Sequence, residues 1–231
     1  MFLSKVVLQS HSPGVHRLLA DIYRQHRFVL SAFPDRNGPE VPRAEETALT
    51  GTRPAVLYRV ETADNGNRFF LLVQSELEPD WERAIDLHPG LALTSCAKEV
   101  LPVFAAGQTL RFRLRANPTK MYINGDIAVR ANHQRSGLYR EEEQRDWLDR
   151  QAARTGFRVG SGGTLIIPKG VLQGAKPSRQ DEGKRHEVKC LAVDFEGALI
   201  VTDAEAFAKA FANGIGRGKA WGCGLLSLAK G

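Results

Sequence analysis

The order of strand-like and helix-like segments is the feature that most restricts the fold of this chain. Residues Phe2–Gln9 are apolar and β-branched enough for a buried strand, and a helical pattern of apolar residues follows them. Two further strands are predicted at Ala55–Glu61 and Arg68–Gln74, joined by a turn that contains Asn-Gly. A short helix at Asp80–Ile85 and a strand before Phe104 complete a strand-helix-strand-strand-helix-strand order, which is ferredoxin-like.

The same order repeats in the second half of the chain. Thr109–Ala116 is predicted to be a strand, and Glu141–Arg154 a helix whose end charges complement the helix dipole. A last helix with Thr202 and Glu205 as its capping box precedes a closing strand at Leu225–Leu228. The sequence therefore predicts an α+β protein of two tandem ferredoxin-like (RRM-like) βαββαβ domains, residues 1–104 and 105–231.

Glycine-containing turns predict two hairpins in the middle of the second half. The expected strand pairs are Phe157–Val159 with Thr164–Lys169 across Gly160–Gly163, and Glu187–Phe195 with Ala198–Thr202 across Glu196 and Gly197. Two polar segments are expected to be loops, the second of them mobile: Phe33–Arg43 and Lys176–Arg185.

The first helix is predicted to carry a tyrosine and a histidine at its end. It starts at Ser12 and Pro13, and its apolar stripe runs to Ile22. Tyr23 and His26 are three residues apart, so both side chains point to one face of the helix. A phenol beside an imidazole can move protons near neutral pH. A single helical histidine is also common as a structural residue, and the spacing leaves both interpretations open.

Three arginines alternate along the strand at residues 109–116. Arg111, Arg113 and Arg115 project about 7 Å apart on one face, which is near the phosphate spacing of an extended or A-form nucleic acid strand. Such a row, continued by Lys120, suits contacts with a phosphate backbone. The alternative is an outer sheet face on which the arginines pair with carboxylates.

A glycine-rich loop, GIGRGKAWGCGLL (Gly214–Leu226), carries Arg217 and Lys219. Its glycines allow the backbone to approach a phosphate closely, and the two cations add positive charge. The loop matches neither a Walker A motif nor a dinucleotide-binding fingerprint. A connection whose glycines are required by tight packing explains the pattern equally well.

Charge and cysteine content narrow the class of protein. The formal net charge of +6 favours a polyanionic partner, with nucleic acid first and an anionic membrane second. The three cysteines form no CxxC pair and no HExxH motif is present, so neither a zinc site nor any other metal site or cofactor is indicated. Sparse cysteines and the absence of a signal peptide or a long apolar span predict a cytoplasmic protein that does not enter the membrane.

Taken together, four stretches resemble one family along nearly the whole chain. They are YRQH followed by FPDR, RFRLRANPTK, DFEGALIVTDA and GIGRGKAWGCGLLSLA. On these residues the chain resembles the CasE family, the CRISPR RNA-processing endoribonucleases of type I-E Cascade complexes. One departure is Arg217, which stands where the family often has proline.

The resemblance implies a function and a set of site residues. The family cuts precursor CRISPR RNA at the 3′ base of the repeat stem-loop without metal, by attack of a 2′-hydroxyl that leaves a 2′,3′-cyclic phosphate. It keeps the processed RNA within Cascade, beside the other Cascade subunits. Its catalytic residues correspond to Tyr23 and His26, and a basic hairpin that enters the RNA groove is expected at Phe157–Val171, with Arg158 and Lys169 as contacts.

The expected division of labour follows from ordinary acidities. An imidazole can serve as base or acid, whereas a free phenol, with a pKa of about 10, is a poor base. His26 is therefore expected to carry the proton, with Tyr23 as a positioning group. Arg27 or Lys219 is expected to stabilise charge on phosphorus. The alternatives are an RNA-binding subunit of the same fold that does not cut and, with less support, a DNA-binding regulator.

Overall fold

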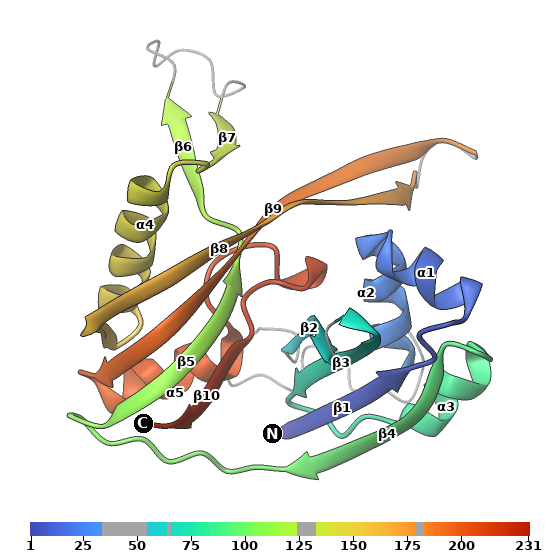
Figure 1. Ribbon diagram of the computed structural model, residues 1–231, viewed down its shortest axis with the longest axis horizontal. Coiled ribbons are helices and arrows are strands. Elements are labelled where there is room, and N and C mark those ends of the chain that lie inside the picture. Colours follow the sequence, from blue (N-terminus) through green and yellow to red (C-terminus); the bar gives the residue numbers. More distant parts are fainter. Residues whose placement is uncertain (34–54, 64–65, 124–132, 179–182) are drawn as a thin grey trace, which may run out of the picture.

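The two halves of the chain each form a four-stranded antiparallel sheet, and the sheets lie beside one another (Figure 1). The computed structural model describes residues 1–33, 55–63, 66–123, 133–178 and 183–231. The strand orders are β2-β3-β1-β4 and β10-β5-β9-β8, which are both ferredoxin-like. The predicted fold class is therefore confirmed. Within those ranges, no helix is long and apolar enough to cross a membrane.

The first sheet is built from the strands that the sequence predicts. Its strands are β1 (Phe2–Leu8), β2 (Val56–Ala63), β3 (Arg68–Ser75) and β4 (Ala92–Glu99). Helix α3 (Trp81–Leu87) begins after Asp80, whose carboxylate accepts a hydrogen bond from the Arg83 backbone N–H. The buried core on the helix side includes Val6, Leu71 and Phe28.

The prediction of a single first helix is wrong, because two helices are present. Helix α1 (Pro13–Leu19) is capped by Ser12 as expected, but α2 (Ile22–Ser31) is a separate helix. The carboxylate of Asp21 accepts hydrogen bonds from the backbone N–H groups of Tyr23 (2.8 Å) and Arg24 (3.3 Å). Asp21 is therefore an N-cap, and the Tyr23–His26 run starts a helix rather than ending one.

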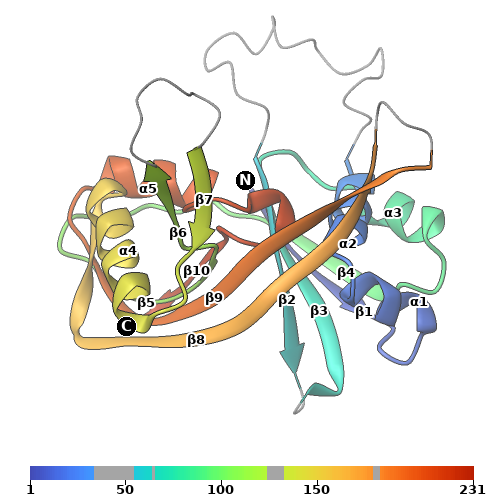
Figure 2. The same ribbon diagram turned by 90° about the horizontal axis from the view of Figure 1, so that it is seen from above.

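The second sheet contains β5 (Thr109–Ala116) and β10 (Leu226–Lys230), with helices α4 (Glu141–Arg154) and α5 (Ala204–Asn213) covering its apolar face (Figure 2). Between β5 and α4 the chain forms a hairpin of β6 (Thr119–Ile123) and β7 (His133–Gly137). The sequence analysis did not predict this hairpin.

Both hairpin predictions for this half of the chain are wrong. Residues Phe157–Pro177 form one long strand, β8, which pairs with a second long strand, β9 (Arg185–Val201). The glycines at residues 160–163 form a bulge in β8, since Val159 pairs with Leu199 and Thr164 already pairs with Gly197. Gly197 allows close packing rather than a turn, because a Cβ there would lie 2.9 Å from the Gly163 carbonyl oxygen. The expected groove-entering hairpin at Phe157–Val171 is accordingly part of a single strand.

Two smaller predictions also fail in this half. The N-cap of α5 is Asp203, whose carboxylate accepts from the Glu205 and Ala206 backbone N–H groups, so Thr202 is not the cap. The ends of the expected loop at Lys176–Arg185 belong to paired strands, since Lys176 pairs with His186 and Pro177 with Arg185. Residues 179–182 and nearly all of the loop expected at Phe33–Arg43 lie outside the described residues, as does the asparagine of the expected Asn-Gly turn.

Candidate functional site

Tyr23 and His26 lie in the first turns of α2, a helix that contacts the glycine-rich loop. Both side chains are half-buried. The His26 ring meets the Trp221 ring edge to face, with 5.4 Å between the ring centroids. Trp221 belongs to η2 (Lys219–Trp221), a single helical turn within the glycine-rich loop. Trp221 was not among the predicted site residues, because a ring contact between segments 195 residues apart in the chain leaves no local signal.

The buried Tyr58 side chain of β2 ties α2 to the same loop. Its hydroxyl oxygen lies 3.1 Å from the carbonyl oxygen of Ala220 in η2 and 3.4 Å from that of Ile22 in α2. Burial raises the pKa of Tyr58 well above its ordinary value, so the hydroxyl stays protonated and acts as a donor. Its single proton is shared between the two acceptors, and this holds the start of α2 beside η2.

The two cations expected near the pair lie in different surroundings. Lys219 is half-buried in η2, and burial lowers the pKa of its ammonium group. Arg27 is exposed on α2. The pKa of His88, at the end of α3, is lowered mainly by the burial of His88 and further by the positive charge of Arg27. Lys219 is therefore the cation on the Trp221 side of the pair, whereas Arg27 lies toward α3.

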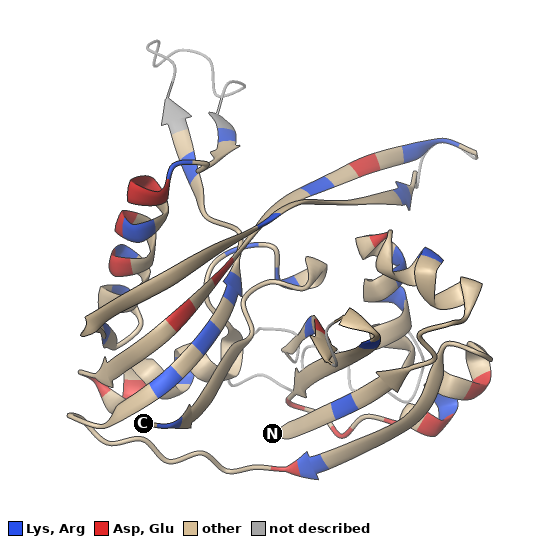
Figure 3. Ribbon diagram, in the orientation of Figure 1, with Lys and Arg blue, Asp and Glu red and all other residues tan. Residues whose placement is uncertain are grey.

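The arginines of β5 do not form one open row. Arg115 is buried and binds Asp194 of β9 with two hydrogen bonds, of 2.7 and 2.9 Å. Arg113 pairs with Glu196 (2.7 Å) and Glu61 (3.3 Å). This geometry agrees with the alternative of carboxylate partners for Arg113 and Arg115, although the pairs are not on an open outer face. Arg111 is exposed on the same strand. Figure 3 shows basic bands along β5 beside acidic bands on the neighbouring β9.

Two contacts of these arginines join the halves of the chain, because Arg113 pairs with Glu61 and the Arg115 guanidinium donates to the Val60 carbonyl oxygen (2.9 Å). Arg59 of β2 is 1% exposed and bonds to Glu61 at 2.6 Å. It also donates to the Leu225 carbonyl oxygen (3.1 Å) and to the Ser227 hydroxyl (2.8 Å) in the second half. Arg59 was not among the predicted site residues, because one arginine inside an apolar strand gives no sign of its distant partners. Asp194 and Glu196, two residues apart, were a usable signal for partners of the arginine row.

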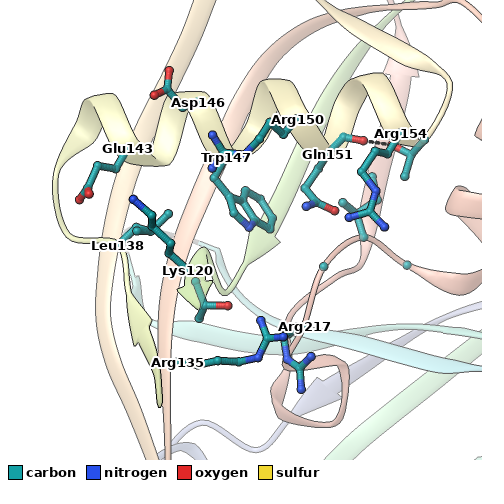
Figure 4. A pocket seen from close by; sticks show the side chains of 15 residues that line it. Lys120, Arg135, Leu138, Glu143, Asp146, Trp147, Arg150, Gln151, Arg154 and Arg217 are labelled. Atoms are coloured by element: carbon teal, nitrogen blue, oxygen red, sulfur yellow. Dashed lines mark hydrogen bonds between the residues drawn. The ribbon is translucent and has the colours of Figure 1, made fainter. Parts of the chain in front are cut away.

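A basic pocket lies between the β6–β7 hairpin, α4 and the start of the glycine-rich loop (Figure 4). It encloses about 710 Å³. Two acidic side chains line it, Glu143 and Asp146. The basic side chains outnumber them and are Lys120, Arg135, Arg150, Arg154 and Arg217. Figure 4 shows Arg135 and Arg217 at the same end of the pocket, opposite α4. The structure thus brings together two predicted contacts, Lys120 and Arg217, and adds three arginines that were not assigned to a site.

The glycine-rich loop connects this pocket to the Tyr23–His26 pair. Residues 214–217 line the pocket, and Trp221 reaches His26. Its glycines are also tightly packed, since a Cβ at Gly216 would lie 2.9 Å from Trp147 and one at Gly218 would lie 2.9 Å from the Cys190 sulfur. The packing interpretation of these glycines is therefore supported, and a phosphate contact stays a prediction.

The other two expected RNA contacts lie on β8, away from that pocket. Arg158 is exposed and pairs with Ile200. Lys169 is partly exposed, with its ammonium nitrogen 3.9 Å from an Asp194 carboxylate oxygen. In the described part of the chain, no group of three or more His, Cys, Asp or Glu side chains could hold a metal ion.

Comparisons with known proteins relate this architecture to one family. Residues 1–230 match the family described as CRISPR associated protein. The CRISPR-associated endoribonuclease Cse3 of Thermus thermophilus is 35% identical over 237 residues, covering 99% of this chain and 100% of its own. The CRISPR system Cascade subunit CasE of Escherichia coli is 28% identical over 99% of both chains. A structure of the endoribonuclease Cse3 bound to a 19-nucleotide RNA superposes with a TM-score of 0.74, at 34% identity over 99% of this chain and 100% of that one.

Proposed function

Because the chain belongs to the CRISPR-associated protein family, together with the Cse3 and CasE relatives, we propose that it is an endoribonuclease that matures CRISPR RNA. Its substrate is the stem-loop of the precursor repeat, which it cuts at the 3′ base of the stem. It keeps the product and assembles with other Cascade subunits, which implies a cytoplasmic location. The similarity to Cse3 bound to RNA, over essentially the whole chain, supports this assignment.

The observation that carries the proposal is the Tyr23–His26 pair, held by an N-cap at one end and by Trp221 at its side. The reaction is an internal transesterification without a metal ion. A 2′-hydroxyl attacks the adjacent phosphorus, the bond to the 5′-oxygen breaks, and the products carry a 2′,3′-cyclic phosphate and a 5′-hydroxyl. His26 transfers a proton at one of these oxygens, Tyr23 orients the phosphate by hydrogen bonding, and Lys219 offsets the charge that develops on it.

The basic pocket gives the RNA a path to this pair. Lys120 and Arg217 in the pocket, with Arg135, are suited to phosphates of the stem. Arg27, Arg111, Arg158 and Lys169 are further contacts that we propose from the sequence and from their exposure. Arg113 and Arg115 are less suited to this role, because carboxylates already occupy their guanidinium groups.

The division of the chain into domains 1–104 and 105–231 is part of the same proposal. The four strands of the first sheet all precede residue 104, and the four strands of the second sheet all follow residue 105. In this arrangement the first domain supplies the catalytic helix. The second domain supplies the basic pocket and the glycine-rich loop.

The first test is cleavage of a synthetic repeat stem-loop RNA in excess EDTA. The wild-type protein should cut it, and His26→Ala should cut about 100- to 10,000-fold more slowly while still binding the RNA. His16→Ala is a matched control, because His16 is exposed on α1 and its ring bonds to the Ser10 carbonyl oxygen. An RNA with 2′-deoxyribose at the cleavage position should bind and stay intact.

Three other outcomes of this test would contradict the proposed function or its mechanism. Tight binding without cutting by the wild-type protein would favour a non-catalytic RNA-binding subunit of this fold. Cutting that EDTA abolishes would require a metal site. Cutting of the 2′-deoxy RNA would exclude attack by the 2′-hydroxyl.

A further inference from the structure

The long strands β8 and β9 continue past the second sheet as an arm that crosses the start of α2 (Figures 1 and 2). We define the arm as residues 170–177 and 185–192, which pair with each other beyond the part of β9 that pairs with β5. The arm, α2 and the glycine-rich loop share a small apolar cluster of Ile22, Cys190, Ala192 and Cys223, with Leu172, Val188 and Trp221 packed against it. The element opposite the catalytic helix is therefore the arm.

The arm lies close against the start of α2 at Gly174. A Cβ added to this glycine would lie 2.7 Å from the Asp21 carboxylate oxygen Oδ1, 2.8 Å from the Tyr23 backbone nitrogen and 2.9 Å from the Ile22 side chain. Real Cβ atoms essentially never come within 3.0 Å of other heavy atoms, and one of these neighbours is backbone. Gly174 is not among the glycines with positive φ, so an alanine would change the contact and not the backbone preference.

We propose that Gly174 is a positioning residue for the Tyr23–His26 pair, an inference that rests on the proposed function. The carboxylate oxygen that it contacts is the one that accepts the Tyr23 and Arg24 N–H groups and so starts α2. Only a residue without a Cβ lets the arm lie against this cap and hold the first turn of α2 at its distance from the loop. The contact fixes where Tyr23 lies, and His26 follows at the next turn.

An alanine at this position must either push the arm away or break the cap. Both responses shift the first turn of α2 relative to Trp221 and the bound phosphate. A displacement of about 1 Å from the reactive geometry costs about 100-fold in rate. We therefore expect Gly174→Ala to lower the cleavage rate of bound RNA about 10- to 100-fold, with the dissociation constant changed less than about threefold.

The experiment compares Gly174→Ala with Gly162→Ala and His26→Ala in single-turnover cleavage of repeat RNA at saturating protein. Gly162 lies on the same strand, has no positive φ, and a Cβ there would meet nothing within 4 Å, so this variant should cleave as the wild type does. The ring signal of His26 in a carbon–proton NMR spectrum should move in Gly174→Ala and stay in place in Gly162→Ala.

The outcomes separate the two proposals. If His26→Ala cleaves normally, the proposed function fails. If His26→Ala is inactive while Gly174→Ala keeps both the wild-type rate and the wild-type His26 signal, the positioning role of Gly174 is wrong. If Gly174→Ala does not fold, Leu172→Ala tests the packing of the arm on the cluster that contains Ile22 of α2, and a wild-type rate with an unmoved His26 signal would overturn the positioning of α2 by the arm.

Discussion

Replacing Arg115 with methionine should destabilise the protein, because Asp194 would lose the cation that neutralises it. Arg115 and Asp194 are about 9% and 4% exposed, and two hydrogen bonds join them. Removing one partner of a buried ion pair costs about 3–5 kcal/mol of folding free energy. Lys169 stays 3.9 Å from the carboxylate, so we expect the lower end, about 3 kcal/mol.

For a chain of this length, 1 kcal/mol corresponds to about 2–4 °C in the melting temperature. Arg115→Met should therefore lower Tm by about 6–12 °C in a thermal melt followed by circular dichroism. Arg111→Met is the matched control, because Arg111 lies on the same strand and is exposed. Its free energy of unfolding should change by less than about 0.5 kcal/mol.

The salt dependence of RNA binding should change when Arg111 is replaced and stay the same when Arg115 is replaced. If Arg111 contacts a phosphate, Arg111→Met should reduce the slope of log affinity against log salt by about one, measured by RNA titration at several salt concentrations. Arg115→Met, below its lower melting temperature, should keep the wild-type slope. A Tm within 2 °C of the wild type for Arg115→Met, or a reduced salt slope for that variant, would refute the assignment of Arg115 to a buried ion pair with Asp194.

Three further results are expected. Gly216→Ala should cost more than about 1 kcal/mol of stability in urea titrations, because Gly216 has φ +80° and a Cβ would lie 2.9 Å from Trp147; an unchanged midpoint would contradict this packing. The pKa of His88 is lowered by burial and by Arg27, so between that pKa and 6.5 the unfolded chain binds more protons. Stability should consequently rise with pH through this window, and His88→Gln should flatten the rise seen in melts from pH 4.5 to 7.5. Iodoacetamide should label the native protein at Cys96, which is exposed, before the buried pair Cys190 and Cys223, as mass spectrometry would show; equal labelling of all three cysteines would contradict their burial.

Sequence patterns with a range of a few residues predicted much of the fold. The strand of residues 109–116 and the helix of residues 141–154 have the predicted bounds, because alternation and end charges act between neighbours along the chain. The short helix predicted at Asp80–Ile85 is present as α3, Trp81–Leu87. Tyr23 and His26 were singled out by their spacing, which survives even though they start a helix instead of ending one.

The failures occur where two local solutions compete. The glycines at residues 160–163 suit either a turn or a bulge. They form a bulge because β9 pairs with the segments on both sides of them. Thr202 and Asp203 can both cap α5, and the carboxylate provides the cap. Neither choice can be made without knowing which segments lie alongside.

By itself the sequence determined the fold class with its two ferredoxin-like halves, and the residue types of the candidate site, since these depend on periodicity and on spacing. Only the tertiary structure decided that Arg113 and Arg115 join the halves through Glu61 and Val60, that Trp221 meets His26 and that Gly174 lies on the cap of α2. The physical reason is the separation along the chain between the residues that interact. Backbone hydrogen bonding and side-chain alternation act over a few residues, whereas the ion pairs and ring contacts described above join partners between 52 and 195 positions apart, such as Arg113 with Glu61 and His26 with Trp221.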